Sequence, residues 1–289
     1  MSQLDFILWL QSLRSPLFDT FFTIVNTTAE DNFITALAVI LFWCIDPLVG
    51  LRFLLTLLFS GYLNSILKYL YHTPRPTTEQ VRFMVVPSDG SYAFPSGHTQ
   101  NAAVLWSYLA GHFRKEPLFV AAVVMIPLVG LGRIYRGAHW PVDVLGGIAI
   151  GVALVWLALA IYRVWDRRSL SLPLWGQLAL GVTAPLALFA VHPKTSLQMG
   201  SALGMITGLA LERRYVGFPV RLPLWKQVLK VLIGMAVLVA LQTLLPKLFP
   251  VGPAFRFTRY ALIGLWGTLG APFVFRTIFG SKETTSNRT

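Results

Sequence analysis

The sequence predicts an all-α, polytopic membrane helix bundle. Of its 289 residues, 55% are hydrophobic and only 12% carry a charged side chain, whereas a soluble domain averages about 25% charged residues. The apolar residues also stand in long runs and do not alternate with polar ones. A soluble domain of this length would still need a charged surface, so composition and pattern together indicate a chain that spans a membrane.

About nine segments are predicted to be membrane spans, because about 20 helical residues cross a hydrocarbon core. The first, third and seventh of them are short for this purpose. The segment 15–28 is expected to form a partial, non-spanning helix. The predicted spans are residues 30–45, 47–68, 99–113, 118–135, 141–164, 173–191, 197–212, 224–246 and 257–278.

The N-terminal segment is not typical of a secretory signal peptide, because it has no basic region before its short apolar run. Phe6, Ile7, Trp9 and Leu10 instead predict a short helix that lies in the membrane interface. The polar tail 281–289 is predicted to be disordered. The expected division of the chain is therefore 1–165, then 166–280 with additional spans, and then the tail.

Two polar segments, 72–98 and 132–143, interrupt the apolar pattern and would lie on the same side of the membrane if the spans alternate. The net charge of +12 would suggest a nucleic-acid partner in a soluble protein. Here the Lys and Arg residues lie between apolar runs, so we expect no nucleic-acid partner. Most of the Lys and Arg residues outside the two polar segments fall on the other side of the membrane, for example at 114–115, 163–168 and 213–214.

The excess of positive charge sets the expected orientation, since cytoplasmic loops are rich in Lys and Arg. The two polar segments then face out of the cytoplasm, and the C-terminus lies inside. The compact loops favour the plasma (inner) membrane of a bacterium, with the polar segments toward the periplasm.

His139 is predicted to be a nucleophile, because Asp143 follows it at i+4 and Pro141 favours the first turn of a helix. That spacing puts both side chains on one helical face. The carboxylate would fix the tautomer of the ring, leave the other nitrogen with a free lone pair, and stabilise positive charge after attack. Asp143 would also be an ionisable group within a membrane span. Such groups are costly in a bilayer and usually have a function, which favours a functional role for Asp143.

A phosphate group is the expected target, because Lys68, Arg75 and Arg133 supply positive charge at the same membrane face. Arginine can bind two oxygens at once, and lysine acts as a point charge. Ser96 and Gly97 precede a predicted helix, so free backbone N–H groups there would bind oxygens as well.

His98 is the expected general acid and base. It could protonate the leaving oxygen and later take a proton from the attacking water. Its ordinary pKa near 6.5 suits both roles. Taken singly, these residues also have structural explanations, such as helix starts, snorkelling cations and interfacial histidines; His72, His112 and His192 are interpreted in that way. Taken together, two histidines, a carboxylate and three cations on one face favour catalysis.

The pattern resembles the type 2 phosphatidic acid phosphatase superfamily, also called the lipid phosphate phosphatases. That signature is a Lys, six residues and Arg-Pro; then Pro-Ser-Gly-His; then Ser-Arg, five residues, His, three residues and Asp. The matching positions are Lys68, Arg75, Pro76, Pro95, Ser96, Gly97, His98, Arg133, His139 and Asp143. Gly132 is the one departure, where the family usually has Ser.

The resemblance implies a membrane phosphatase core over 1–165, a phosphohistidine intermediate on His139, Asp143 as its partner and His98 as acid and base. It also implies phosphate binding by Lys68, Arg75, Ser96, Gly97 and Arg133. It implies a lipid phosphate or prenyl pyrophosphate as the substrate. No cofactor or metal is expected, because the sequence shows no cluster of metal ligands. The spans in 166–280 are expected to be scaffold, homodimer surface or lipid-side wall.

Two other functions stay open. The number of predicted spans is similar to that of the glucose-6-phosphatase branch, so a sugar phosphate could be the substrate. A catalytically silent protein that binds or transports phospholipid would need the cations but not the two histidines and the carboxylate.

Overall fold

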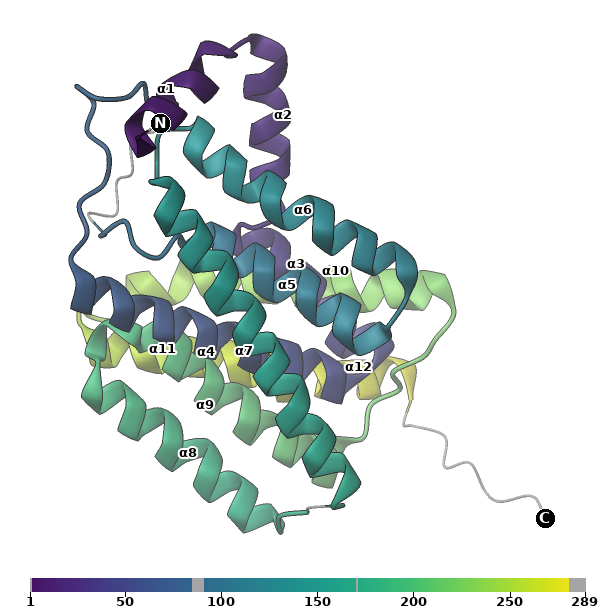
Figure 1. Cartoon of the computed structure of the whole chain (residues 1–289). Helices are drawn as coiled ribbons and strands as arrows, with labels where there is room; N and C mark the ends of the chain where they lie inside the picture. Colours follow the sequence, from purple (N-terminus) through teal and green to yellow (C-terminus); the bar gives the residue numbers. More distant parts are fainter. Residues whose placement is uncertain (1, 85–90, 170, 281–289) are drawn as a thin grey trace. The chain divides into compact units, whose positions relative to one another are not determined.

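The computed structural model describes residues 2–84, 91–169 and 171–280. These residues contain helices and no strand, which confirms the predicted all-α class (Figure 1). The α-helices are α1 (Gln3–Ser12), α2 (Pro16–Thr27), α3 (Asp31–Ile40), α4 (Pro47–Tyr71), α5 (Gly97–Phe113), α6 (Glu116–Tyr135), α7 (Pro141–Arg167), α8 (Leu174–Val191), α9 (Ser196–Leu211), α10 (Leu224–Leu248), α11 (Pro253–Leu265) and α12 (Ala271–Phe279). Short π-helical turns are η1 (Leu41–Ile45), η3 (Glu212–Val216) and η4 (Trp266–Gly270), and η2 (Pro193–Thr195) is a 3₁₀ turn.

The predicted count of nine spans is not confirmed. Within the described ranges, 6 helices are long and apolar enough to cross a membrane: α4, α6, α7, α8, α10 and the run Pro253–Phe279. There are up to 7 if α2 and Asp31–Ile45, which bend by 45°, form one span. The predicted spans 99–113 and 197–212 are α5 and α9, helices of only 17 and 16 residues. The chain is thus a membrane protein with several spans, and the predicted partial helix is α2.

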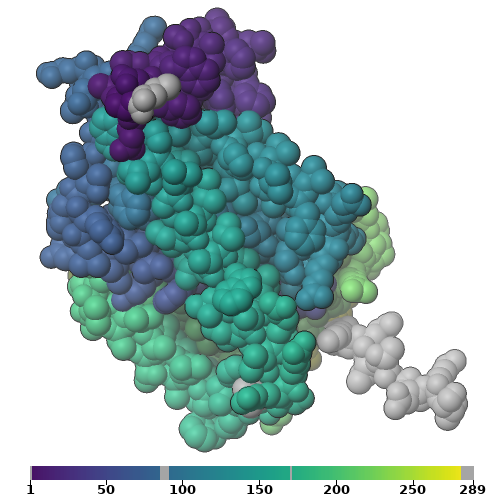
Figure 2. Space-filling model, in the orientation of Figure 1, coloured from purple at the N-terminus to yellow at the C-terminus, as the bar shows by residue number. Residues whose placement is uncertain are grey.

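The chain forms two units, each interrupted in sequence: Met1–Thr35 with Phe59–Leu170, and Ala36–Leu58 with Ser171–Thr289. In the first unit, α5 packs against α6 and α7, and α2 packs against α6. Gly147 on α7 allows this close approach, because a Cβ there would lie 2.8 Å from the carbonyl oxygen of Ser96. Figure 2 shows the purple atoms of α1 and α2 against the teal atoms of the same unit, where α1 contacts α6 and α7.

In the second unit, α9 packs against α8 and α11. Small residues again allow contact between backbones: a Cβ on Gly204 would lie 2.0 Å from the carbonyl oxygen of Ala261. Lys230 of α10 is fully buried in this unit. Its Nζ donates to the carbonyl oxygens of Trp43 at 2.7 Å and Val220 at 2.8 Å, which compensates for the loss of water around the ammonium group.

Candidate active site

His139 lies in the turn between α6 and α7. Gly137 has a φ of +74° in this turn, a conformation that glycine adopts at little steric cost. The Ala138 N–H closes the turn by donating to the carbonyl oxygen of Arg133 at 3.1 Å. The His139 side chain is only 2% exposed, so the turn holds the imidazole inside the first unit.

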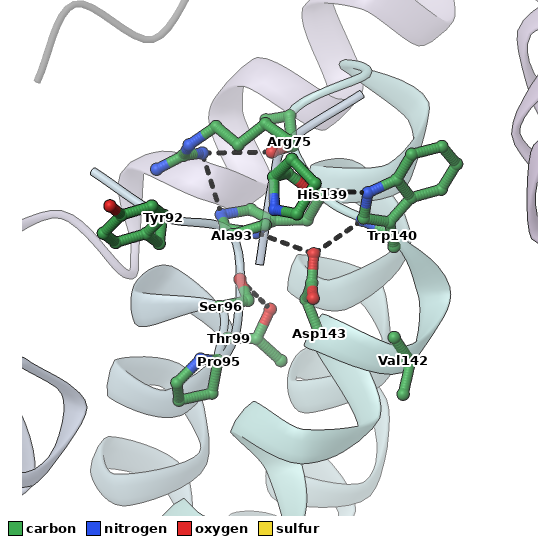
Figure 3. Close-up of polar contacts among 12 residues, drawn as sticks. Arg75, Tyr92, Ala93, Pro95, Ser96, Thr99, His139, Trp140, Val142 and Asp143 are labelled. Atoms are coloured by element: carbon green, nitrogen blue, oxygen red, sulfur yellow. Dashed lines mark hydrogen bonds and ion pairs between the residues drawn. The ribbon is translucent and has the colours of Figure 1, made fainter. Parts of the chain in front are cut away.

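Asp143 lies in the first turn of α7 and is fully buried. Its Oδ2 lies 3.4 Å from Nδ1 of His139 and accepts a hydrogen bond from the Trp140 N–H at 2.8 Å. Figure 3 shows the carboxylate between the imidazole and the Trp140 backbone. The structure therefore brings together the two residues that the i, i+4 spacing predicts to be neighbours.

Arg75 occupies the other side of the imidazole. Its Nη1 lies 3.3 Å from Nε2 of His139, and arginine has only donors. This contact assigns the lone pair to Nε2 and the proton of the neutral ring to Nδ1, which faces Asp143. Arg75 is held by the carbonyl oxygen of Ser91 at 2.8 Å, by the Ser91 hydroxyl at 2.8 Å and by the Ala138 carbonyl oxygen at 3.0 Å.

The remaining predicted cations also act on His139. Burial holds its pKa well below the usual range, and the charges of Arg133, Arg75, Lys68 and His98 lower it further. The imidazole is therefore neutral at neutral pH. A neutral ring with a lone pair on Nε2 is the form that can attack an electrophile.

Three of these groups, Lys68, Arg133 and His98, stand at helix ends, and Arg75 lies in the segment between α4 and α5. Lys68 is in the last turn of α4, and its Nζ donates to the carbonyl oxygens of Tyr92 and Ala93. Arg133 is in the last turn of α6, and His98 is the second residue of α5. The ends of three helices thus bring cationic side chains to one imidazole, which suits an anionic ligand.

Ser96 differs from the prediction of a free backbone donor. Its N–H donates to the carbonyl oxygen of Asp143 at 3.0 Å, and its hydroxyl pairs with that of Thr99 at 2.9 Å. Ser96 therefore joins the start of α5 to α7. Gly97 is the first residue of α5, a position whose N–H has no acceptor within its own helix.

A polar network from α4, which was not predicted, supports the start of α5. Asn64 donates to the carbonyl oxygen of Pro95 at 3.2 Å and to the side chain of Gln100 at 2.9 Å. Gln100 in turn donates to the carbonyl and hydroxyl oxygens of Ser60 at 2.9 and 2.7 Å. Satisfied buried networks of this kind fix one arrangement of the chain.

The N-terminal helix α1 supports the His139 turn from its other side, which was also not predicted. The Gln11 side chain donates to the carbonyl oxygens of Arg82 at 2.8 Å and Tyr135 at 3.0 Å, and it accepts from the Arg82 N–H at 3.1 Å. Gln3 accepts from the N–H of Val142 at 3.0 Å. Contacts from one helix thus reach both sides of the turn.

Two family models match the sequence. Residues 49–167, which include every candidate site residue, match the PAP2 superfamily, and residues 197–283 match the transmembrane extension of the PAP2 superfamily phosphatases. The helices α1 and α2 lie outside both matched ranges.

Individual proteins are also similar. Lipid phosphate phosphatase delta of Arabidopsis thaliana is 29% identical over 233 residues, which are 70% of this chain and 54% of that protein. This chain thus spans about half the length of that relative. A crystal structure of a transmembrane PAP2-type phosphatidylglycerolphosphate phosphatase from Bacillus subtilis is 28% identical, covers 56% of this chain and 84% of that one, and has a TM-score of 0.49.

Phosphatidylglycerophosphatase B of Bacillus subtilis (strain 168) is 30% identical over 158 residues, which are 50% of this chain and 75% of that protein. The match includes most of the length of this relative, and the motif residues that converge on His139 lie within the range of the first family model. The chain therefore belongs to the PAP2 superfamily.

Proposed function

We propose that this chain is a membrane phosphatase that hydrolyses the phosphate ester or pyrophosphate of a lipid, with Nε2 of His139 as the nucleophile. The observation that carries the proposal is the difference between the two ring nitrogens. Nδ1 faces the Asp143 carboxylate at 3.4 Å, and Nε2 faces the Arg75 guanidinium at 3.3 Å. The lone pair therefore points to the side where cations would hold a phosphate group.

In the first step, Nε2 attacks phosphorus, and the N–P bond forms as the bond from phosphorus to the leaving oxygen breaks. His98 donates a proton to that oxygen. Arg75, Arg133 and Lys68 compensate the charge of the phosphoryl oxygens. Asp143 stabilises the ring, which becomes cationic while Nδ1 keeps its proton.

In the second step, a water molecule attacks the phosphohistidine, and His98 takes a proton from the water. The N–P bond breaks, Nε2 regains its lone pair, and inorganic phosphate leaves. His98 is then protonated again for the next substrate, so the cycle needs no further proton carrier.

The substrate class is proposed from the relatives. Their names include phosphatases of lipid phosphate, phosphatidylglycerophosphate, sphingosine 1-phosphate and lipid A, and a diphosphatase of undecaprenyl diphosphate. These substrates share a phosphate group on a lipid. A site placed at the ends of membrane helices would receive such a group from the bilayer surface.

Phosphate release by the purified chain tests the proposal. The panel should contain phosphatidic acid, a prenyl pyrophosphate, a sphingoid phosphate and glucose 6-phosphate. We expect release from a lipid phosphate or pyrophosphate, its loss in His139→Ala, and a phosphoenzyme that is labile in acid. His112→Ala is the matched control, because His112 is in the last turn of α5, about 21 Å along the helix from His98.

Turnover in His139→Ala would contradict the mechanism, and faster turnover of glucose 6-phosphate would contradict the substrate class. We also propose that no metal ion is needed, because side chains supply the positive charge. In the described part of the chain, no three His, Cys, Asp or Glu residues form a group that could hold a metal ion. EDTA should accordingly leave the rate unchanged.

We further propose that the site faces out of the cytoplasm, in the plasma membrane of a bacterium, with a cytoplasmic C-terminus. The distribution of Lys and Arg supports this orientation. A membrane-impermeant thiol reagent can test it on intact cells, using a cysteine placed at Thr78 in a Cys44→Ser background. If that cysteine reacts with the reagent only after the cells are lysed, the proposed orientation is contradicted.

A further inference from the structure

A pocket of about 260 Å³ lies between α10 and α11, both in the second unit. Two arginines, a glutamine and a tyrosine line it together with apolar residues. The lining includes Gln242, Leu245, Arg256, Arg259, Tyr260 and Ile263.

The two arginines of this pocket lie in a long stretch of sequence that contains no acidic residue. No Asp or Glu occurs between Glu212 and Glu283. Arg256 and Arg259 are one helical turn apart on α11, so both reach the same side of the helix. The Arg256 guanidinium lies 5.9 Å from the Tyr260 ring. In the described part of the chain, neither arginine forms an ion pair with a carboxylate, and two adjacent cations of this kind favour an anionic ligand.

The pocket also has an apolar part, formed by Leu245, which is buried, and Ile263. It lies where two candidate spans meet the connection between them, since α10 ends at Leu248 and α11 begins at Pro253. If both helices span the bilayer, this end of them would lie near the headgroup region, where basic pockets between helices bind lipid headgroups. A volume of 260 Å³ is below the range of about 300–1,000 Å³ that holds a drug-sized molecule, so a headgroup would fit but not whole acyl chains.

We propose that this pocket binds the phosphodiester headgroup of an anionic membrane phospholipid. The guanidinium groups of Arg256 and Arg259 would each bind phosphate oxygens in pairs. The Gln242 amide and the Tyr260 hydroxyl would donate to the remaining oxygens or to the headgroup, and the acyl chains would stay in the bilayer. Binding of a lipid in this pocket does not require the proposed catalysis.

Native mass spectrometry of the purified full chain can test this site, with phosphatidylglycerol as the probe and phosphatidylcholine as the zwitterionic comparison. Phosphatidylglycerol carries a phosphate diester and no monoester, so the proposed phosphatase reaction would not consume it. The test variant is Arg256→Lys with Arg259→Lys, which keeps both charges and hence the topology, but loses the paired hydrogen bonds. The matched control is Arg167→Lys with Arg168→Lys, at the end of α7.

We expect the affinity for phosphatidylglycerol to fall about tenfold or more in the test variant, as the loss of charge-assisted hydrogen bonds would produce, and to change less than about twofold in the control. Tyr260→Phe, which changes no charge, should weaken binding severalfold. This variant replaces the double variant in the test if the double variant does not fold. An equal loss in test and control variants, or equal binding of both lipids, would overturn the proposal. Displacement of the lipid by millimolar inorganic phosphate would also overturn it, because the site would then take a soluble anion.

Discussion

Nδ2 of Asn26 occupies the space that a side chain on Gly132 would need, since a Cβ built on Gly132 would lie 2.0 Å from it. Asn26 is fully buried on α2, and its Nδ2 donates to the carbonyl oxygen of Phe22 at 2.8 Å. Gly132 is the one motif position where this chain departs from its family. The departure has a physical reason, because α2 packs where the usual serine side chain would lie.

Gly132→Ser should therefore destabilise the protein by about 1–3 kcal/mol, the usual cost of overpacking a buried site. Thermal unfolding in detergent measures the loss, and adding Asn26→Ala should recover most of it. Gly267→Ser is the control, because a Cβ on Gly267 would meet nothing within 4 Å. Unchanged stability of the single Gly132→Ser variant would contradict this packing.

Asp143→Asn should lower kcat by about 10²–10⁴-fold, as the loss of an orienting aspartate does in a catalytic triad. The amide oxygen can still accept from the Trp140 N–H, so the first turn of α7 is kept. The same oxygen, Oδ2, faces Nδ1 of His139, so the neutral amide would no longer stabilise the positive charge that the ring gains when Nε2 attacks. Steady-state kinetics and a melting curve together separate this effect from unfolding; a loss below tenfold would exclude Asp143 from this role.

The acid limb of kcat/KM should lie below pH 6.5, the ordinary pKa of histidine, because burial and the neighbouring cations lower the pKa of His139. A cation disfavours the protonated ring, so its removal raises the pKa. Arg133→Gln should therefore move the acid limb to higher pH, apart from any loss of rate. Arg136→Gln removes a charge that does not act on His139 in this way, and a similar movement of the limb in that variant would refute the assignment.

Gln11→Ala should lower both stability and rate. Two backbone carbonyl groups, those of Arg82 and Tyr135, would lose a donor, at a cost of about 1–3 kcal/mol. The turn that carries His139 would also move, so we expect a severalfold fall in kcat. Ser12→Ala is the control on the same helix, because the Ser12 hydroxyl bonds only within α1, to the carbonyl oxygen of Trp9. Equal kinetics in the two variants would show that α1 does not position the turn.

The apolar runs and motif spacings predicted the helices and the gathering of Lys68, Arg75, Arg133 and His139, because both depend on local periodicity and on helix ends. The number of spans was not predictable, since α5 and α9 are helical but shorter than a bilayer usually requires. The bond from the Ser96 N–H to Asp143, and the support from Gln11, depend on tertiary packing. Neither contact leaves a pattern in the sequence.

The Ser96 N–H donates to the carbonyl oxygen of Asp143, and Gly147 packs against the carbonyl oxygen of Ser96; this junction between α5 and α7 has a practical consequence for handling the protein. The proposed phosphate-binding residues and the turn that carries His139 depend on several helices for their positions, and membrane helices can persist after they separate. Catalytic competence would then vanish at detergent or temperature conditions that leave the circular dichroism of the helices intact. Turnover, not helical content, is the suitable measure of whether a preparation is native.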